Sequence, residues 1–318
     1  MADKHTKNGD RDLHSRIARL NRGALDARPA PRPAAEDLKR ALRKKRRRKK
    51  PERPDQIIYR RDLPRQVSTP YRAVAQPGQK VTLEEAVDGT EVSHPKQGKG
   101  FLVESRIDDP DSAASVSKTF ETAAASDESS LRKRVASSCG LGSFAPTDVV
   151  FLDLETTGLG NSPLFLIGTM LWNDGSFVVR QYLARNYAEE AAVISLFLEA
   201  CDGKRLLVTF NGKSFDVPYV RTRSVANGIP YPFVPAHFDM LHECRRIWKD
   251  VLPNCKLQTL ESHICGRARC GDIPGEEIPE AYHAYVRTEN AWQMVEVLKH
   301  NMLDLITMAD LMTRFPEP

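Results

Sequence analysis

Little in the sequence suggests a secreted or membrane protein. There are only 6 cysteines among 318 residues, and no CxxC pair, which excludes a small disulfide scaffold and favours a reducing compartment. No stretch approaches the roughly 20 apolar residues of a membrane-spanning helix, and the polar first residues hold no apolar core of a secretory signal. We therefore expect an intracellular protein with no membrane partner, cytoplasmic and associated with the nucleoid, or nuclear in a eukaryote.

Negative charge is scarce at one end of the chain. Residues 1–50 hold 18 Lys or Arg against 6 Asp or Glu, a net charge of +12, whereas residues 151–318 hold 16 against 21, a net charge of −5. The overall charge of +5 therefore conceals a basic head on an acidic body. This asymmetry indicates a tether for an anionic partner, attached to a domain whose carboxylates have another role.

Composition divides the chain into three parts. Residues 1–54 have no aromatic residue and cannot bury enough apolar surface to offset the entropy of ordering, so we expect a disordered basic arm. Residues 55–146 predict a small β-rich module and linker, and residues 147–318 are long enough to form the folded body. Within the middle part, strands are expected at 57–59, 81–83 and 101–103, and a linker or weak helix at 109–130.

Strand-like and helix-like patterns alternate within the body. The pair Asp174-Gly175 between two apolar runs indicates a hairpin. An early hairpin followed by strand–helix alternation predicts an α/β fold, a mixed sheet covered by helices. The expected strands are 149–154, 164–172, 177–183, 206–210 and 233–240, and the expected helices are 189–200, 215–226, 241–248 and 290–315.

Two carboxylates end the first strong strand of the body. Residues i and i+2 of a strand face the same side, so Asp153 and Glu155 point one way, and no Arg or Lys lies within several residues to neutralise them. A divalent cation with oxygen ligands, Mg²⁺ or Mn²⁺, would relieve their repulsion. Gly158, shortly after them, permits a close approach of a ligand.

Two further elements carry acidic residues. Asp216 follows the strand at 206–210, at the carboxyl end where α/β sheets bind ligands, although taken alone it is better explained as an acidic residue at a helix N-terminus. His300 and Asp304 share one face of the last helix, although alone they are better explained as a solvated polar stripe. The three elements together are far more specific than any one of them.

Together these motifs resemble a known family. The string FLDLETTGL at 151–159, the pattern N-x3-F-D ending at Asp216, and a late helix with a residue four before Asp304 resemble the DEDD exonucleases of the ribonuclease-H-like fold. More narrowly, the chain resembles the YprB-like ribonuclease-H-like domain family, which the segments 58–64 and 272–276 also match. The resemblance covers about residues 55–318 and leaves the basic head outside.

The resemblance implies a hydrolase, a metal-dependent 3′→5′ exonuclease acting on DNA or RNA. Asp153, Glu155, Asp216 and Asp304 would ligate two Mg²⁺ or Mn²⁺ ions, and His300 would be the general base. His300 precedes Asp304 by four residues, the spacing of family members with Tyr there, whereas members with His place it five before. The residues expected to contact the substrate are Thr156, Thr157, Gly158, Leu159, Asn211 and Phe215.

A two-metal reaction needs a cage of carboxylates, which gives the acidic body a role, and the basic head would supply attraction to phosphate. Two other functions stay open. One is a nucleic-acid-binding scaffold with little or no catalysis, and the other is an endonuclease on the same fold. The sequence also leaves open DNA versus RNA, and the oligomeric state.

Overall fold

A computed structural model of the chain describes residues 80–107, 116–158, 160–267, 269 and 271–318. All of them fall in one of the two compact units into which the chain divides. The predicted basic arm at 1–54 and the predicted strand at 57–59 lie outside the described residues.

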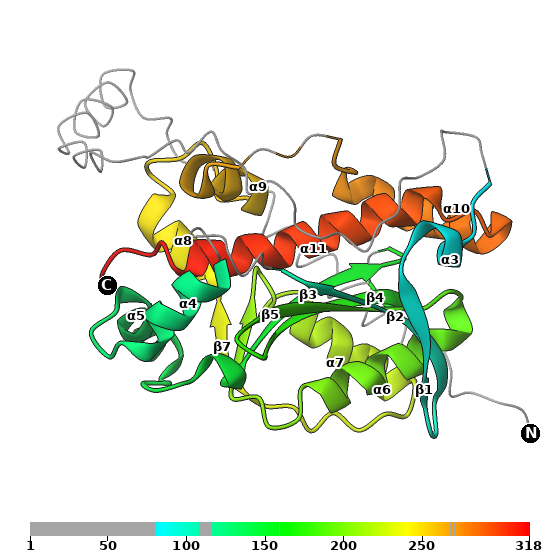
Figure 1. Cartoon of the computed structure of the whole chain (residues 1–318), viewed down its shortest axis with the longest axis horizontal. Coiled ribbons are helices and arrows are strands. Elements are labelled where there is room, and N and C mark those ends of the chain that lie inside the picture. The colour runs from blue at the N-terminus through cyan, green and yellow to red at the C-terminus, as the bar shows by residue number, and fades with distance from the viewer. Residues whose placement is uncertain (1–79, 108–115, 159, 268, 270) are drawn as a thin grey trace, which may run out of the picture. The chain divides into compact units, whose positions relative to one another are not determined.

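A seven-stranded sheet forms the centre of the described part (Figure 1), in the order β1-β2-β5-β4-β3-β6-β7. The first five strands pair antiparallel, and β6 and β7 are added in parallel beside β3. The carboxyl ends of the three parallel strands therefore share one edge, the place where α/β sheets bind ligands. The strands are β1 (Gly89–His94), β2 (Gly98–Arg106), β3 (Val149–Thr156), β4 (Leu164–Asn173), β5 (Ser176–Leu183), β6 (Leu206–Thr209) and β7 (Ala236–Asp239).

Helices cover both faces of the sheet (Figure 1). The long α11 lies on one face, against β3, β4 and β5, and α6 and α7 lie on the other. The α-helices are α3 (Leu83–Ala86), α4 (Val116–Ala125), α5 (Ser130–Cys139), α6 (Glu190–Ala200), α7 (Asp216–Ala226), α8 (Met240–Trp248), α9 (Leu257–Leu260), α10 (Ile278–Thr288) and α11 (Trp292–Met312). Shorter helical turns are η1 (Pro146–Asp148), η2 (Tyr187–Glu189), η3 (Glu261–Cys265) and η4 (Gly275–Glu277).

The inner strand β3 is apolar because β4 and β6 flank it on its two edges and helices cover both faces of the sheet. Phe151 of β3 packs edge to face against Phe120 of α4 and Phe177 of β5, with ring centroids 5.8 and 5.5 Å apart. Such aromatic pairs stabilise by about 0.5–1.5 kcal/mol beyond their burial. This packing fixes β3, and with it the direction in which Asp153 and Glu155 leave the strand.

The predicted α/β fold, a mixed sheet covered by helices, is confirmed. The predicted hairpin joins β4 to β5, and its turn residues Asp174 and Gly175 have φ of 47° and 79°, as a tight hairpin requires. The predicted strand at 81–83 is wrong. Thr82 caps α3, since its hydroxyl accepts from the Glu85 backbone N–H while the Glu85 carboxylate accepts from the Thr82 N–H, and this capping box starts a helix.

Within the described part of residues 55–146, the strands β1 and β2 belong to the same seven-stranded sheet as the strands of the body. Residues 101–103 lie in β2 as predicted, and β2 pairs with β5 of the body, with Phe101 opposite Leu183. The α4 helix falls inside the predicted linker or weak helix at 109–130. The division into residues 1–54, 55–146 and 147–318 itself stays a prediction. None of the described helices combines the length and the apolar composition needed to cross a membrane.

Candidate active site

Two of the predicted acidic residues lie at the carboxyl end of β3. Asp153 and Glu155 alternate with buried neighbours, so they share a face of the strand. From α11, the Asn301 Nδ2 donates to the Asp153 Oδ2 at 2.7 Å and to the Asp153 carbonyl oxygen at 3.2 Å. The close approach of Asn301 depends on Gly168, the register partner of Asp153 on β4, because a Cβ there would overlap the Asn301 amide.

Their surroundings disfavour charge on these two carboxylates. Burial raises the pKa of Asp153 and of Glu155 well above the usual range, and repulsion from Asp304 and Asp216 adds to both shifts. The hydrogen bond from Asn301 opposes the shift of Asp153. Carboxylates influence one another in this way only when they lie within a short distance. The four predicted acidic residues are therefore brought to one place.

Asp216 is the first residue of α7, beyond the carboxyl end of β6. Burial raises its pKa to about 7, while hydrogen bonds from the backbone amides of Asp216 itself and Leu154 oppose the shift. Asp239 and Asp304 raise it further by repulsion. Asp216 is thus part of the acidic group and not only a favourable residue at a helix N-terminus.

The loop between β6 and α7 is held by Asp239, the buried last residue of β7. Its two carboxylate oxygens accept from the backbone N–H of Asn211 at 2.9 Å and of Lys213 at 3.0 Å. Asn211 has a φ of 70°, a conformation that Asn tolerates better than most residues. Asp239 therefore sets the path of the loop that leads to Asp216.

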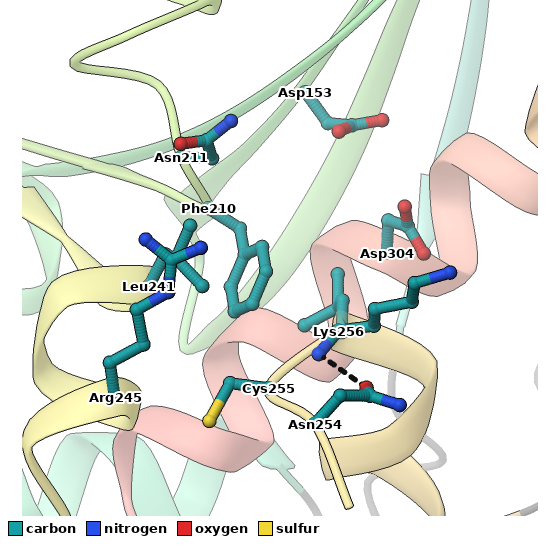
Figure 2. Close-up of a pocket in the computed structure, with 10 residues that line it drawn as sticks. Asp153, Phe210, Asn211, Leu241, Arg245, Asn254, Cys255, Lys256 and Asp304 are labelled. Atoms are coloured by element: carbon teal, nitrogen blue, oxygen red, sulfur yellow. Dashed lines mark hydrogen bonds between the residues drawn. The ribbon is translucent and has the colours of Figure 1, made fainter. Parts of the chain in front are cut away.

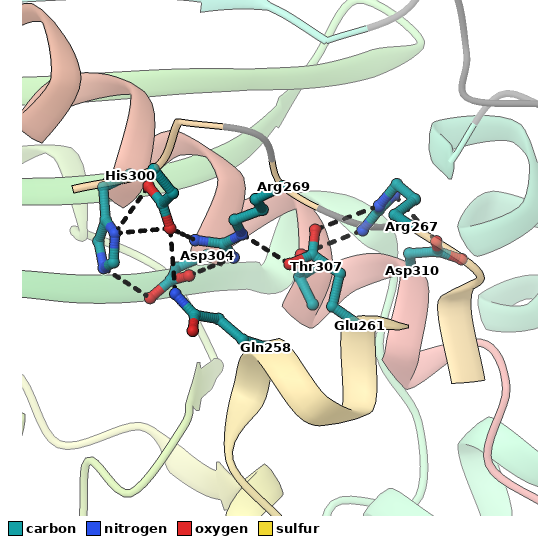
Figure 3. A network of polar contacts seen from close by, with 9 residues as sticks. Gln258, Glu261, Arg267, Arg269, His300, Asp304, Thr307 and Asp310 are labelled. Carbon is teal, nitrogen blue, oxygen red and sulfur yellow. Dashed lines mark hydrogen bonds and ion pairs between the residues drawn. The ribbon is translucent and has the colours of Figure 1, made fainter. Parts of the chain in front are cut away.

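α11 supplies the fourth carboxylate and the predicted base (Figure 3). His300 and Asp304 lie one helical turn apart, with the His300 Nε2 3.7 Å from the Asp304 Oδ2. The His300 Nδ1 lies 3.0 Å from the Asp272 Oδ1, and Arg269 forms an ion pair with Asp304. Burial raises the pKa of Asp304, and the neighbouring Arg269 and His300 oppose this shift. The predicted pair is therefore part of a buried network and not a solvated stripe.

The donor set suits a hard dication by its chemistry, since carboxylate oxygens are the ligands that Mg²⁺ and Mn²⁺ prefer. The arrangement differs from a ligand cage: within the described ranges, no group of three His, Cys, Asp or Glu side chains is placed to hold a metal ion. Asn301 holds Asp153, and Arg269 holds Asp304, so each of these carboxylates already has a protein donor. The four metal ligands and the two ions stay a prediction.

The turn after β3 is held by its own hydroxyl groups. The Thr156 Oγ1 donates to the Gly158 carbonyl at 2.9 Å, and the Thr157 Oγ1 donates to the Pro163 carbonyl at 3.0 Å. Gly158 has a φ of 152°, which favours glycine. The two threonines, predicted to contact substrate, thus serve the turn itself, and Leu159 lies outside the described residues.

A cavity of about 430 Å³ opens beside Asp153 and Asp304 (Figure 2). Asn211, a predicted substrate contact, lines it, and the half-buried Phe210 adds an aromatic surface. The predicted substrate contact Phe215 lies elsewhere, in a second hollow that Tyr219 also lines.

Two exposed cationic side chains, Arg245 of α8 and Lys256 just before α9, also line the first cavity. Within the described residues, neither forms an ion pair with a carboxylate. The acidic site therefore adjoins a cavity with an aromatic wall and two unneutralised positive charges, and its size is in the range of small-molecule sites.

The sequence analysis gave no site role to three polar residues of the site: Asn301, Arg269 and Asp272, although Asp272 begins the segment 272–276 that carries part of the resemblance. The available signal for Asn301 was Gln181, a glutamine within the otherwise buried β5, because a buried amide needs partners. Its Nε2 donates to the Asn301 Oδ1 at 3.0 Å and to the Leu298 carbonyl at 2.7 Å. Arg269 and Asp272 lie between η3 and η4. This segment has no regular hydrophobic pattern from which its position in the fold could be predicted.

The sheet has this mixed order, and acidic residues of β3, α7 and α11 gather at the carboxyl end of β3. These two features define a protein of the RNase H-like class. A family model agrees: residues 150–315 match the RNase H superfamily, and the chain belongs to that family. The predicted ribonuclease-H-like fold is thus confirmed, while the DEDD type stays a prediction.

Two individual proteins are similar to parts of this chain. The chain is 34% identical over 169 residues to the uncharacterized protein YprB of Bacillus subtilis (strain 168), an alignment that covers 52% of this chain and 41% of YprB. The chain thus spans less than half the length of this curated relative. A family B DNA polymerase from the hyperthermophilic archaeon Pyrobaculum calidifontis is similar with a TM-score of 0.41 and 18% identity, over 51% of this chain and 24% of the polymerase.

Proposed function

We propose that the protein is a metal-dependent nuclease, a 3′→5′ exonuclease that hydrolyses phosphodiester bonds of DNA or RNA. The observation that carries the proposal is the gathering of Asp153, Glu155, Asp216 and Asp304 from three elements at one place. The charge of Asp304 raises the pKa of the other three, and the charge of Asp216 raises the pKa of Asp153 and Glu155. Gathering buried carboxylates without cations opposes folding. A scaffold that only binds nucleic acid gains nothing from such a set.

These four carboxylates would hold Mg²⁺ or Mn²⁺, two ions in the proposed reaction. Bound cations would supply Lewis acidity and neutralise the charge of the phosphodiester. All four proposed ligands are carboxylates and none is a thiolate, which favours these hard cations over zinc.

His300 is the residue that would take a proton from the attacking water. Its Nδ1 faces Asp272 and its Nε2 faces Asp304, so the ring presents one nitrogen toward the acidic site. Histidine is the side chain that most often acts as a general base. The structure thus supports His300 as the base, despite its distance of four residues from Asp304.

The cavity beside the acidic site is the proposed place of the substrate strand. Phe210 offers a surface on which a nucleobase can stack, and Arg245 and Lys256 can neutralise phosphates. The positive charges of Arg245 and Lys256 would attract the negatively charged nucleic acid, which the four carboxylates alone would repel. Residues 1–54 would add long-range attraction from outside the described part.

The experiment is digestion of linear and covalently closed circular DNA and RNA by the full chain, with Mg²⁺ or Mn²⁺ and with EDTA as the control. The proposal predicts metal-dependent loss of linear strands and intact circles. Cleaved circles would indicate an endonuclease instead. Binding of strands without any digestion would indicate a scaffold, and would contradict the proposal.

A further inference from the structure

The guanidinium group of Arg269 lies against three carboxylates, one of which belongs to the proposed metal ligand Asp304 (Figure 3). Its Nε donates to the Glu261 Oε2 at 2.6 Å, its Nη1 to the Asp272 Oδ2 at 3.1 Å, and its Nη2 to the Asp304 Oδ1. The side chain is only 7% exposed. Since an arginine side chain does not lose its proton in proteins, a permanent positive charge touches one of the proposed metal ligands.

Arg269 has no equivalent elsewhere in the acidic group. Among the described residues, no other Arg or Lys forms an ion pair with Asp153, Glu155, Asp216 or Asp304. Asp304 is also the neighbour whose charge acts most strongly on both Asp153 and Glu155. A positive charge next to Asp304 therefore reduces the repulsion that Asp304 exerts on Asp153 and Glu155. Arg269 supplies this positive charge.

The contact with Arg269 also opposes the binding of a metal ion. A guanidinium and a dication on one carboxylate repel each other strongly at such short range, and the Asp304 Oδ1 already accepts from Arg269. The arrangement fits a state in which the protein supplies its own counter-ion.

We propose that Arg269 takes the place of one of the two divalent cations in the metal-free protein, and that binding of this cation displaces the Arg269 guanidinium from Asp304. The inference rests on the proposed metal site and names its regulation. Displacement does not expose the arginine, because Glu261 and Asp272 still hold it. The second cation then binds more weakly than the first, since its binding must break an existing ion pair.

The test is Mn²⁺ binding to the full chain without nucleic acid, followed by electron paramagnetic resonance, for the wild type and for Arg269→Gln. Removal of the competing charge should strengthen binding of the weaker ion by about 10-fold or more. The matched control is Arg267→Gln. Arg267 is also buried and paired with Glu261, but its other partners are Asp310 and Thr307 rather than a proposed ligand.

Equal or weaker Mn²⁺ binding by folded Arg269→Gln, or the same gain in Arg267→Gln, would overturn the inference. The outcome is independent of the proposed function. Digestion of nucleic acid with unchanged Mn²⁺ binding in Arg269→Gln leaves the nuclease standing and removes the inference. Stronger Mn²⁺ binding by Arg269→Gln, together with no digestion by the wild type, would support the inference and contradict the proposed nuclease.

A second measurement covers the case in which Arg269→Gln does not fold. In the wild-type chain, the NMR signal of the Arg269 Nη2 hydrogens, which contact Asp304 and would be assigned with Arg269→Lys, should shift when Mg²⁺ saturates the weaker site. The signal of Arg267 should stay in place. An Arg269 signal that is unchanged by saturating Mg²⁺ would overturn the inference.

Discussion

The Asp272 Oδ1 lies 3.0 Å from the Nδ1 of His300, so a carboxylate outside the proposed metal site orients the predicted base. Asp272 is itself held in place, since its Oδ2 accepts from the Gln258 Nε2 at 3.0 Å and from the Arg269 Nη1 at 3.1 Å. A hydrogen bond at one ring nitrogen selects the tautomer and fixes the ring orientation. Asp272 is thus a positioning residue for His300.

Asp272→Asn should therefore impair turnover rather than binding. The amide keeps the shape of the side chain but can donate where the carboxylate accepts, and this favours the wrong orientation of the ring. We expect kcat to fall by about 10- to 100-fold with an unchanged KM, measured by steady-state digestion. Asp310→Asn, which alters the same network at a residue away from His300, is the control. An equal loss in Asp310→Asn would show that Asp272 acts only through the fold.

His300 and Asp304 should separate when each is replaced by alanine. Asp304→Ala removes a ligand, so we expect weaker Mn²⁺ binding and loss of turnover together. His300→Ala leaves the carboxylates in place, so metal binding and substrate binding should persist while turnover falls by about 10²–10⁴. Mn²⁺ titration and single-turnover digestion measure the two effects. A wild-type rate for His300→Ala would assign the base to another residue.

The half-buried His237 gives a prediction about pH. Its Nε2 is hydrogen-bonded to the Thr209 Oγ1 at 2.8 Å, and burial lowers its pKa to about 4. Between the ordinary pKa of about 6.5 and this value, the unfolded chain binds a proton that the folded chain does not. The free energy of unfolding therefore falls as the pH falls through this window.

We expect His237 to account for about 1–2 kcal/mol of this loss, allowing for the partial exposure of the ring. Urea unfolding of the metal-free protein at several pH values, for the wild type and for His237→Gln, measures it. The difference between the two removes the contribution of the acidic group. Parallel curves for the two proteins would contradict the assignment.

Deletion of residues 1–54 should weaken binding and leave the chemistry intact. The segment carries the excess of positive charge, and each phosphate that a protein neutralises contributes about 0.9 to the salt slope on duplex DNA. We expect a flatter dependence of affinity on salt and a nearly unchanged rate at saturating substrate. Fluorescence anisotropy at several salt concentrations measures the slope. An unchanged slope would remove the role proposed for this segment.

The sequence predicted the sheet of the body because its strands are apolar runs and its turns carry glycine. It failed at 81–83, where the apolar Val81 and Leu83 suggested a strand and the local capping box of Thr82 and Glu85 started a helix. The joining of β2 to β5 could not be predicted either. Pairing between segments so far apart in the chain depends on packing that no local pattern records.

The acidic residues of the site could be predicted because their three motifs together resemble those of the DEDD exonucleases, although Asp216 and Asp304 taken alone would not have been assigned to a site. Their partners could not. Arg269 and Asp272 lie in an irregular segment, and only the fold brings them to Asp304 and His300. Asn301 was adjacent to a predicted site residue, but its contact with Asp153 depends on the space that Gly168 leaves.

Digestion of end-labelled strands by the wild type and by Asp153→Asn tests the central claim most directly. The substitution keeps the shape of the side chain and removes the charge, so the fold should persist. With Mg²⁺ or Mn²⁺, the wild type should release a 3′ label at once as mononucleotide and shorten 5′-labelled strands stepwise, while Asp153→Asn should leave both intact. Digestion by folded Asp153→Asn at a rate near that of the wild type, or by the wild type in EDTA, would contradict a metal-dependent nuclease built on these carboxylates.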